Sequence, residues 1–346
     1  MVAPETGDIV ADAGVTLEQL QVAAGEHGWD VGVDFGARSA ATVGAMVATN
    51  AGGSRVARWG TFGSRTVGAE AVDGRGAIVG TWSLQPLAKS SLGFAWPGAL
   101  IGSEGTLGVI TAARVRCVRP MPAVSAGVGR CRADELPTVL AALRRIRDVD
   151  QVEFLARGAW AIADAPPPGI ELDDCDVALL VTVAAPDAPA CDVATAAVAA
   201  VLDLHAVDEG GRRVARLRDS VTAALPRLGL PLKLDVVVPG PELGELLVWI
   251  QRWAADRGVR AVLFGHALDG NAHVNVFDVD PERRVDAERE VLGWVVRRGG
   301  AVSAEHGVGV AKRRWLSLMM SPDELDLRAR LRRAWDPAGI MNPGVG

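Results

Sequence analysis

The spacing of apolar residues along the chain changes near residue 120. Before that point the apolar residues form short β-like runs, IVADAG, EAVDGRGAIVGTWSL and GVITAARVRCVRP, within segments rich in Gly and Ala. The second run predicts a hairpin around Asp73-Gly74, and the third predicts a strand closed by Pro120. Beyond residue 120, strands alternate with longer amphipathic helices. This change predicts an α+β protein of two domains, residues 1–120 and 121–346.

Three stretches of the second part have helical periodicity. Residues 135–147 and 192–204 predict two helices, and residues 241–256 predict a third that ends before Gly258. The apolar face of the third helix is expected to consist of Leu243, Leu246, Leu247, Ile250 and Trp253.

Two more helices are marked by the residues at which they begin. Asp280-Pro281 supplies an N-cap and a first-turn proline for one of them. Ser321 is the expected N-cap of the last helix, residues 322–335, which stops before Asp336-Pro337. The core stripe of the helix after Asp280 is predicted to be Val285, Leu292, Val295 and Val296.

Composition and charge then narrow the class of protein. Hydrophobic residues make up 49% and charged residues 23% of the chain, as in soluble globular proteins. The net charge of −6 argues against a nucleic-acid-binding protein, which normally has a basic excess. We expect a cytoplasmic chain, since no transmembrane-length apolar run or signal-peptide pattern is present. No CxxC pair occurs, so buried reduced thiols are expected at Cys117, Cys131, Cys175 and Cys191.

Two histidines flank a strong turn signal in LFGHALDGNAHVNV. Asp269-Gly270 favours a two-residue hairpin turn, which would place His266 opposite His273. Cross-strand neighbours lie about 5 Å apart at Cβ, so both imidazoles could bind one metal ion. Asn275 lies two residues beyond His273 and is expected on the same face. The alternative is a pair of hydrogen-bonded histidines near a turn.

A second stretch, AVSAEHGVGVAK, contains Glu305 and His306 between small residues. A carboxylate and two histidines form a three-ligand set that leaves one metal position open for substrate. His306 would then be available as a base. The alternative for Glu305-His306 is a polar loop without a ligand.

A third stretch is cationic. Arg218 and Thr222 are four residues apart on a predicted helix and therefore face the same way. Lys233 follows in the strand-like PLKLDVVVP. Arginine and lysine suit carboxylate recognition. The alternative, which this stretch alone favours, is that Arg218 is a solvated helix residue.

Two segments rich in small residues, ATVGAMVATNAGG and LIGSEGTLGVIT, fit neither GxGxxG between a strand and a helix nor GxxxxGK[ST]. Glycine allows a backbone to approach a bulky ligand and to donate N–H groups to it. On composition alone, tight turns in a packed sheet are an equal possibility.

Six motifs in a fixed order give the chain a family resemblance: ATVGAMVATNAGG…RWGTF, IGSEGTLGVIT, PLKLDVVVP, GHALDGNAHVNV, SAEHGVGVAKR and DPAGIMNP. This order resembles the FAD-linked D-2-hydroxyacid dehydrogenases along essentially the whole chain. The stretch DFGARSAATVG and the spacing of Arg218, Thr222 and Lys233 look most like the D-2-hydroxyglutarate dehydrogenase branch. The resemblance implies a vanillyl-alcohol-oxidase-type FAD domain followed by a substrate cap domain with an antiparallel sheet flanked by helices.

The resemblance also implies roles for individual residues. His266, His273 and Glu305 match metal ligands, with zinc expected, and His306 matches the catalytic base. Four residues match positions that hold the substrate: Arg218, Thr222, Lys233 and Asn275. The residues that match positions lining the FAD are Thr49, Asn50, Ala51, Gly52, Gly53, Gly102, Ser103, Glu104, Gly105, Thr106 and Gly108.

The implied reaction oxidises a D-2-hydroxy acid to a 2-oxo acid, with hydride transfer to FAD. No nicotinamide motif is present, so a separate electron acceptor is expected, and a homo-oligomer is left open. Residues 5–20 already match the family beyond its first glycine-rich loop, so we expect an N-terminally truncated FAD-binding domain. Two alternatives are a non-catalytic remnant that binds metal or an organic acid without FAD, and a metal-dependent hydrolase.

Overall fold

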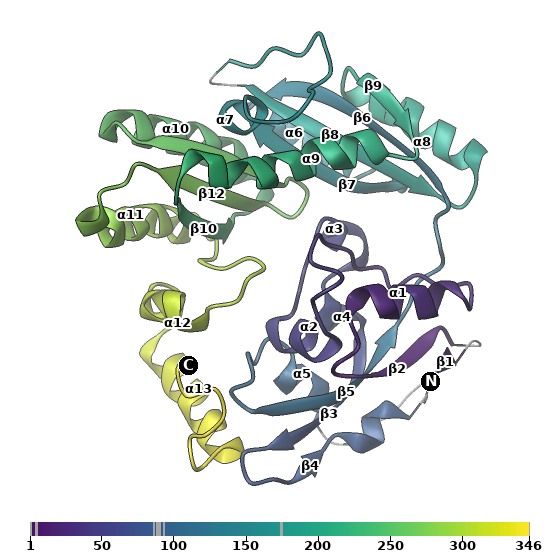
Figure 1. Ribbon diagram of the computed structural model, residues 1–346, viewed down its shortest axis with the longest axis vertical. Helices are drawn as coiled ribbons and strands as arrows, with labels where there is room; N and C mark the ends of the chain where they lie inside the picture. The colour runs from purple at the N-terminus through teal and green to yellow at the C-terminus, as the bar shows by residue number, and fades with distance from the viewer. Residues whose placement is uncertain are drawn as a thin grey trace. The chain divides into compact units, whose positions relative to one another are not determined.

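The computed structural model describes residues 2–3, 6–85, 87, 91–92, 94–173 and 176–345. Its contacts divide the chain into two compact units, each visible in Figure 1. The first comprises Met1–Pro120 and Glu305–Gly346, and the second comprises Met121–Ala304. The boundary at residue 120 coincides with the predicted change of pattern. The sequence placed all of 121–346 in one domain, whereas the contacts group residues 305–346 with the first unit.

The first unit is built on an antiparallel five-stranded sheet in the order β1-β2-β5-β3-β4. Its strands are β1 (Val2–Ala3), β2 (Asp8–Asp12), β3 (Thr66–Asp73), β4 (Ile78–Val79) and β5 (Gly108–Arg116). Its helices are α1 (Leu17–Gly25), α2 (Val43–Thr49), α3 (Val56–Trp59), α4 (Phe62–Arg65), α5 (Trp96–Leu100), α12 (Gly309–Lys312) and α13 (Pro322–Trp335). Buried apolar residues of α1 and α2 pack with those of β2, β3 and β5 in one core.

The predicted hairpin of the first unit is present with a wider loop. Strands β3 and β4 pair at Ala71 with Val79 and at Val72 with Ile78. The Asp73 carboxylate closes the loop because it accepts the backbone N–H groups of Arg75 and Ala77 at 2.9 Å. The turn is therefore set by an aspartate side chain as well as by the Asp-Gly pair.

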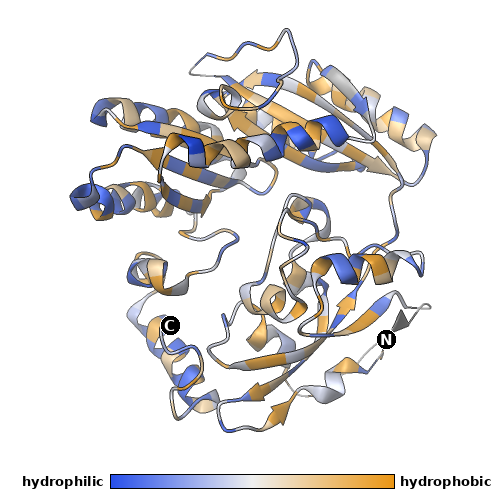
Figure 2. Ribbon diagram, in the orientation of Figure 1, coloured by the Kyte–Doolittle hydropathy of each residue, from blue (hydrophilic) through white to orange (hydrophobic). Residues whose placement is uncertain are grey.

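The second unit is built on an antiparallel seven-stranded sheet in the order β10-β12-β11-β7-β8-β6-β9. Its strands are β6 (Ala123–Arg132), β7 (Val149–Ala156), β8 (Asp176–Ala185), β9 (His205–Glu209), β10 (Leu232–Val237), β11 (Arg260–His266) and β12 (Asn271–Phe277). Its helices are α6 (Leu136–Leu143), α7 (Arg157–Trp160), α8 (Ala188–Val201), α9 (Arg212–Ala224), α10 (Leu243–Arg257) and α11 (Arg284–Arg297). Figure 2 shows that apolar residues are concentrated in the strands of both sheets.

One face of the seven-stranded sheet carries both a core and a polar end. Helix α9 packs Val214, Leu217 and Val221 onto this face, where they join apolar residues of β7, β11 and β12. Alternation along β12 places His273 and Asn275 on the same face as Phe277, which belongs to that core. The sheet thus places His273 and Asn275 on the face that α9 packs against.

The predicted helices are present with shifted ends. In α10 the five predicted apolar positions are all buried, and Gly258 caps the helix in the left-handed conformation (φ 64°). Helix α13 spans the predicted residues, and Ser321 forms a capping box with Glu324. The helix predicted at 192–204 begins earlier, because Asp187 caps the N–H of Ala190. The prediction for α11 was wrong at Val285, which is 38% exposed.

The buried face of α11 also differs in part from the predicted stripe. Leu292 and Val295 are buried as predicted, whereas Val296 is only partly buried. Ala287, Val291 and Trp294 complete the observed core face. Among the described residues, no helix is both long enough and apolar enough to cross a bilayer.

Candidate active site

The histidine hairpin is present, but its register differs from the prediction. Strand β11 ends at His266 and β12 begins at Asn271, so the loop contains four residues rather than two. His266 is therefore opposite Asn271, and His273 is opposite Phe264. The predicted pairing of His266 with His273 was wrong. The longer loop is held in place because the N–H of Ala267 donates to the carbonyl of Val152, and Arg144 donates to the carbonyl of Leu268.

The shift in register still leaves both histidines on one face. A shift by two residues preserves the side of the sheet to which each side chain points, whereas a shift by one would reverse it. The two imidazole centroids lie 5.5 Å apart with their planes at 84°. The two rings thus remain close enough to share a ligand.

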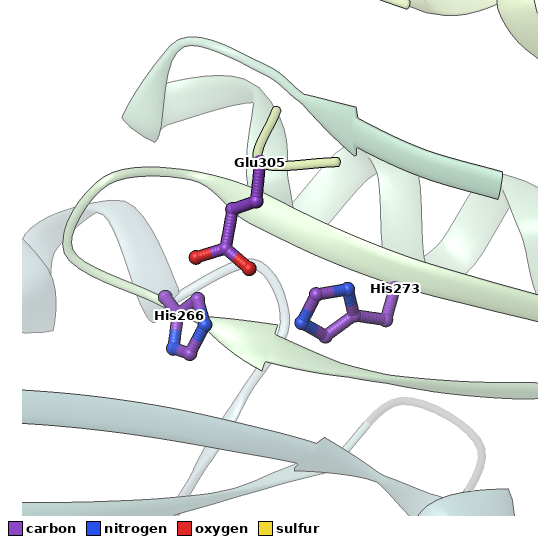
Figure 3. A group of neighbouring side chains, drawn as sticks. All are labelled: His266, His273 and Glu305. Atoms are coloured by element: carbon purple, nitrogen blue, oxygen red, sulfur yellow. The ribbon is translucent and has the colours of Figure 1, made fainter. Parts of the chain in front are cut away.

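Glu305 completes a group of three potential metal ligands (Figure 3). One ligand atom from each of His266, His273 and Glu305 lies within 4.8 Å of the others. Glu305 follows Ala304, whose backbone N–H donates to Asp235 at 3.3 Å. Gly52 also lies close, since a Cβ there would be 3.2 Å from Oε1 of Glu305.

Glu153, which the sequence analysis missed, binds the first histidine. Its Oε1 lies 2.5 Å from Nδ1 of His266, and its Oε2 accepts a bond from Nε of Arg218 at 3.0 Å. Burial by itself would raise the pKa of Glu153, but His266 and Arg218 outweigh burial and lower the pKa to about 2. Glu153 is therefore an anion within the sheet.

Asp235, also missed, lies beside the second histidine. Its Oδ1 is 3.4 Å from Nδ1 of His273 and accepts a bond from the Asn271 amide at 3.1 Å. Both Glu153 and Asp235 are at least 95% buried, each with 5% of its surface exposed. A sequence signal for both existed, because each is an acidic residue within an otherwise apolar strand, in VEFL and LDVVV.

The predicted substrate-binding residues lie on or above the same sheet face. Arg218 donates to Thr222 at 3.3 Å, and its guanidinium carbon lies 5.5 Å from the Phe264 ring centroid. Lys233 is exposed on β10 and pairs with Asn275 in register. Asn275 is buried and donates to the carbonyl of Val262 at 3.4 Å. His306 is exposed and directly follows Glu305.

The two glycine-rich stretches lie side by side in the first unit. The N–H of Gly102 donates to the carbonyl of Val47 at 3.0 Å, and that of Glu104 donates to Ala48 at 2.7 Å. These bonds place loop 102–106 against the end of α2, where Thr49 is the last helical residue and Asn50 is a left-handed cap (φ 52°). Residues about 55 positions apart thus form one local surface.

The glycines of this surface have different local roles. A Cβ at Gly53 would lie 2.3 Å from the carbonyl oxygen of Asp34, and one at Gly108 would lie 2.6 Å from that of Val72. At these two positions, close packing against the backbone is enough to explain the glycine. At Gly105, by contrast, a Cβ would meet nothing within 4 Å. Ala51 accepts the N–H of Phe62 at 2.8 Å, which fixes the chain after α2.

Loop 102–106 also holds the segment that contains Glu305 and His306. The Glu104 carboxylate accepts the N–H groups of Val308 and Gly309, the second at 3.0 Å. Thr106 is buried and bonds internally to the carbonyl of Ser103 at 2.7 Å. The Ser103 hydroxyl oxygen is buried without a hydrogen-bond partner. A buried hydroxyl of this kind requires a partner, and a bound cofactor could supply it.

Both donor sets fit the groups that the family resemblance implies. Two imidazoles and one carboxylate suit a divalent metal such as zinc, and the carboxylates at both Nδ1 atoms match the way proteins orient ligand histidines. For FAD, the glycine-rich surface offers the buried Ser103 hydroxyl and the open space at Gly105.

Family models match both parts of the chain. The model for the C-terminal domain of FAD linked oxidases matches residues 125–345, and an FAD binding domain matches residues 1–81. The C-terminal match continues across residue 304, where the compact units divide.

Curated relatives match nearly the whole chain. An uncharacterized FAD-linked oxidoreductase of Mycobacterium tuberculosis is 33% identical over 97% of this chain and 76% of its own. D-2-hydroxyglutarate dehydrogenase of Xanthomonas citri is 31% identical over 97% of this chain and 75% of its own. D-lactate dehydrogenase of Archaeoglobus fulgidus is 30% identical over 97% of this chain and 76% of its own.

Solved structures support the same fold. An alkyldihydroxyacetonephosphate synthase has a TM-score of 0.70 at 15% identity and covers 99% of this chain. This chain spans 64% of that protein's length. The predicted α+β fold of the vanillyl-alcohol-oxidase type, with antiparallel sheets flanked by helices, is confirmed. The chain belongs to the family of FAD-linked oxidases.

Proposed function

We propose that this chain oxidises a D-2-hydroxy acid to the 2-oxo acid with FAD as the hydride acceptor and with the help of a divalent metal. The single observation that carries the proposal is the grouping of His266, His273 and Glu305 within 4.8 Å in an FAD-linked oxidase. Relatives named D-2-hydroxyglutarate dehydrogenase and D-lactate dehydrogenase support this substrate class. Thus the substrate carries a hydroxyl and a carboxylate on neighbouring carbons.

The reaction removes a hydride from C2 of the substrate and a proton from its hydroxyl. When bound, FAD supplies a two-electron acceptor, and a divalent metal lowers the pKa of the hydroxyl. His266, His273 and Glu305 would hold the metal and leave a position for the substrate. His306, next to Glu305, would take the hydroxyl proton.

Substrate carboxylates would bind the cationic residues near the same sheet face. A guanidinium has five N–H donors, so the bonds from Arg218 to Glu153 and Thr222 do not exhaust its capacity. Lys233 is exposed on β10, beside Asn275. Two cations favour a dicarboxylate such as D-2-hydroxyglutarate over a monocarboxylate such as D-lactate.

The test is anaerobic reduction of the flavin in the full chain reconstituted with FAD and zinc. We expect D-2-hydroxyglutarate to bleach the visible band of oxidised flavin, and we expect the L-enantiomer to leave the band unchanged. The His306→Asn variant should still bind FAD but should reduce it at least about 100-fold more slowly, as expected for a lost general base.

The control variant is His27→Asn, because His27 is exposed in the first unit, where its Nδ1 contacts the carbonyl of Ala23. Its rate should equal that of the unaltered chain. Retained flavin with no bleaching by any D-2-hydroxy acid would overturn the proposed reaction. A chain that binds zinc but no FAD would instead support the alternative of binding without catalysis.

A further inference from the structure

The two ligand histidines share an arrangement that their position in the hairpin does not explain. Each has its Nδ1 beside a buried carboxylate, Glu153 for His266 at 2.5 Å and Asp235 for His273 at 3.4 Å. These carboxylates come from β7 and β10, which flank the hairpin strands in the sheet. The pairing therefore needs three separate segments of chain.

Each carboxylate also makes a second contact at its other oxygen. Glu153 binds Arg218, which is four residues from Thr222 on α9. Asp235 accepts the N–H of Ala304, the residue before Glu305. Asp235 thus connects one ligand histidine to the segment that carries the carboxylate ligand, and Glu153 connects the other histidine to a predicted substrate cation.

The energetic cost of this arrangement points to a function. A buried carboxylate loses its hydration, and ion pairs in a sheet core are often less stabilising than apolar packing. Apolar residues flank both positions along their strands, since Val152, Phe154, Leu234 and Val236 are all buried. If stability were the only requirement, apolar side chains at both positions would stabilise the sheet at least as well.

We propose that Glu153 and Asp235 are positioning residues that hold His266 and His273 with Nδ1 protonated, so that both Nε2 atoms are presented to a divalent cation. A neutral imidazole that donates from Nδ1 has its lone pair on Nε2, the form needed by a metal. Asp235 additionally holds the backbone next to Glu305. The inference deepens the proposed function and rests on its metal.

The test measures metal binding rather than turnover. The Glu153→Gln and Asp235→Asn variants of the full chain are titrated with Zn²⁺ against a chromophoric chelator, and with Co²⁺ by visible absorption. Each variant should bind Zn²⁺ about 10- to 100-fold more weakly than the unaltered chain, which is the usual effect of losing such a partner. The Co²⁺ bands should shift because the ligand geometry relaxes.

Matched controls separate this role from general stability. Glu290→Gln removes a carboxylate that binds Trp253 and Arg257, and Asp278→Asn removes one that binds Arg260, in the same unit and without a histidine. Both controls should bind Zn²⁺ as the unaltered chain does. Circular dichroism checks that every variant is folded.

A second readout needs no metal and is taken on the folded variants. In ¹⁵N-histidine spectra of the metal-free chain, His266 and His273 should both be protonated at Nδ1. In each variant, the histidine that lost its carboxylate should show a mixture of tautomers. Unchanged tautomers and unchanged Zn²⁺ affinity in both variants would overturn the inference while the proposed function stands. Failure of the unaltered chain to bind any divalent cation would overturn the metal in the proposed function and this inference together.

Discussion

A buried polar atom that lacks a hydrogen-bond partner indicates a possible ligand site, because leaving such an atom unpaired is energetically costly. The Ser103 hydroxyl is the clearest case among the residues predicted to line the cofactor, because its oxygen is buried without a hydrogen bond. Neighbouring Thr106, by contrast, bonds to the carbonyl of Ser103 at 2.7 Å. Removing a hydroxyl that bonds within the protein should lower stability, whereas removing one that bonds to a ligand should lower the affinity for that ligand.

We predict that Ser103→Ala leaves the cofactor-free chain as stable as before, or slightly more stable, because no protein bond is lost. The same change should weaken FAD binding about 3- to 10-fold, the usual contribution of one hydrogen bond. Thr106→Val is the matched change and should lower the free energy of unfolding by about 1 kcal/mol. Urea unfolding and flavin titration measure the two effects. Unchanged FAD affinity in Ser103→Ala would contradict the assignment.

Two cysteines give a residue-scale prediction about pH. Burial raises the pKa of the Cys117 and Cys131 thiols to about 12, from an ordinary value of 9.0. The difference of three pKa units lowers the thiolate fraction about 1000-fold at neutral pH. Mass-mapped alkylation at pH 8 should therefore modify these two cysteines only after unfolding. Labelling of either thiol in the folded chain at the rate of a free cysteine would disprove their burial.

The same thiols affect stability in alkaline solution. Between pH 9 and 12 they ionise in the unfolded chain and stay protonated in the folded chain. The folded state then binds more protons, so the free energy of unfolding should fall as the pH rises through this range. The Cys117→Ala variant should show a shallower fall.

Among the elements, the β11–β12 hairpin sets the positions of His266 and His273, two of the three candidate metal ligands. Its loop needs Gly270, since this residue has φ of 77° and a Cβ there would lie 2.0 Å from the carbonyl oxygen of Val238. Backbone contact of this kind cannot be relieved by a side-chain rotation. The position of the loop therefore depends on Val238, the residue that directly follows β10, as well as on the Asp-Gly pair.

We predict that Gly270→Ala lowers the free energy of unfolding by about 2–3 kcal/mol and also weakens Zn²⁺ binding, because β12 begins at the next residue. Gly258→Ala is the matched control. It has φ of 64° with nothing within 4 Å, so only about 1 kcal/mol should be lost, with Zn²⁺ affinity unchanged. Thermal unfolding and chelator competition distinguish the two. Equal losses in both variants would mean that Val238 does not constrain the loop.

At the scale of the whole molecule, the chain returns to its first unit after completing the second. Residues 305–346 lie with Met1–Pro120, and Asn342 donates to the carbonyl of Glu104 at 2.6 Å. The Asp336 side chain lies close to Gly74, where a Cβ would be 2.4 Å from its Oδ1. The C-terminal segment is thus part of the surface that contains the predicted flavin-lining loops.

Each ligand should protect a different set of backbone amides from hydrogen exchange. FAD should slow exchange in residues 47–53 and 102–106, and Zn²⁺ should slow it in residues 266–273 and 303–306. Mass-resolved exchange with each ligand added alone tests both sets. The His266→Ala variant should lose only the protection by Zn²⁺. Protection by FAD confined to 121–304 would contradict the assignment of the glycine-rich loops.

The sequence alone determined the family, the α+β class, the principal helices and the residues that form the candidate metal group. These follow from local patterns. The apolar residues of a helix face such as Leu243 to Trp253 recur at the helical period in the sequence, and a helix cap involves residues only three positions apart. Even with the wrong register, strand alternation correctly placed His266 and His273 on one face.

Only the tertiary structure decided which distant residues meet these local elements. Glu153 lies 113 positions from His266, and no period or spacing encodes a pairing set by the order of strands in a sheet. The hairpin loop length likewise depends on contacts from Val152, Arg144 and Val238 outside the hairpin. The sequence specifies such contacts only through the whole fold, because they form when strands from separate segments pack side by side.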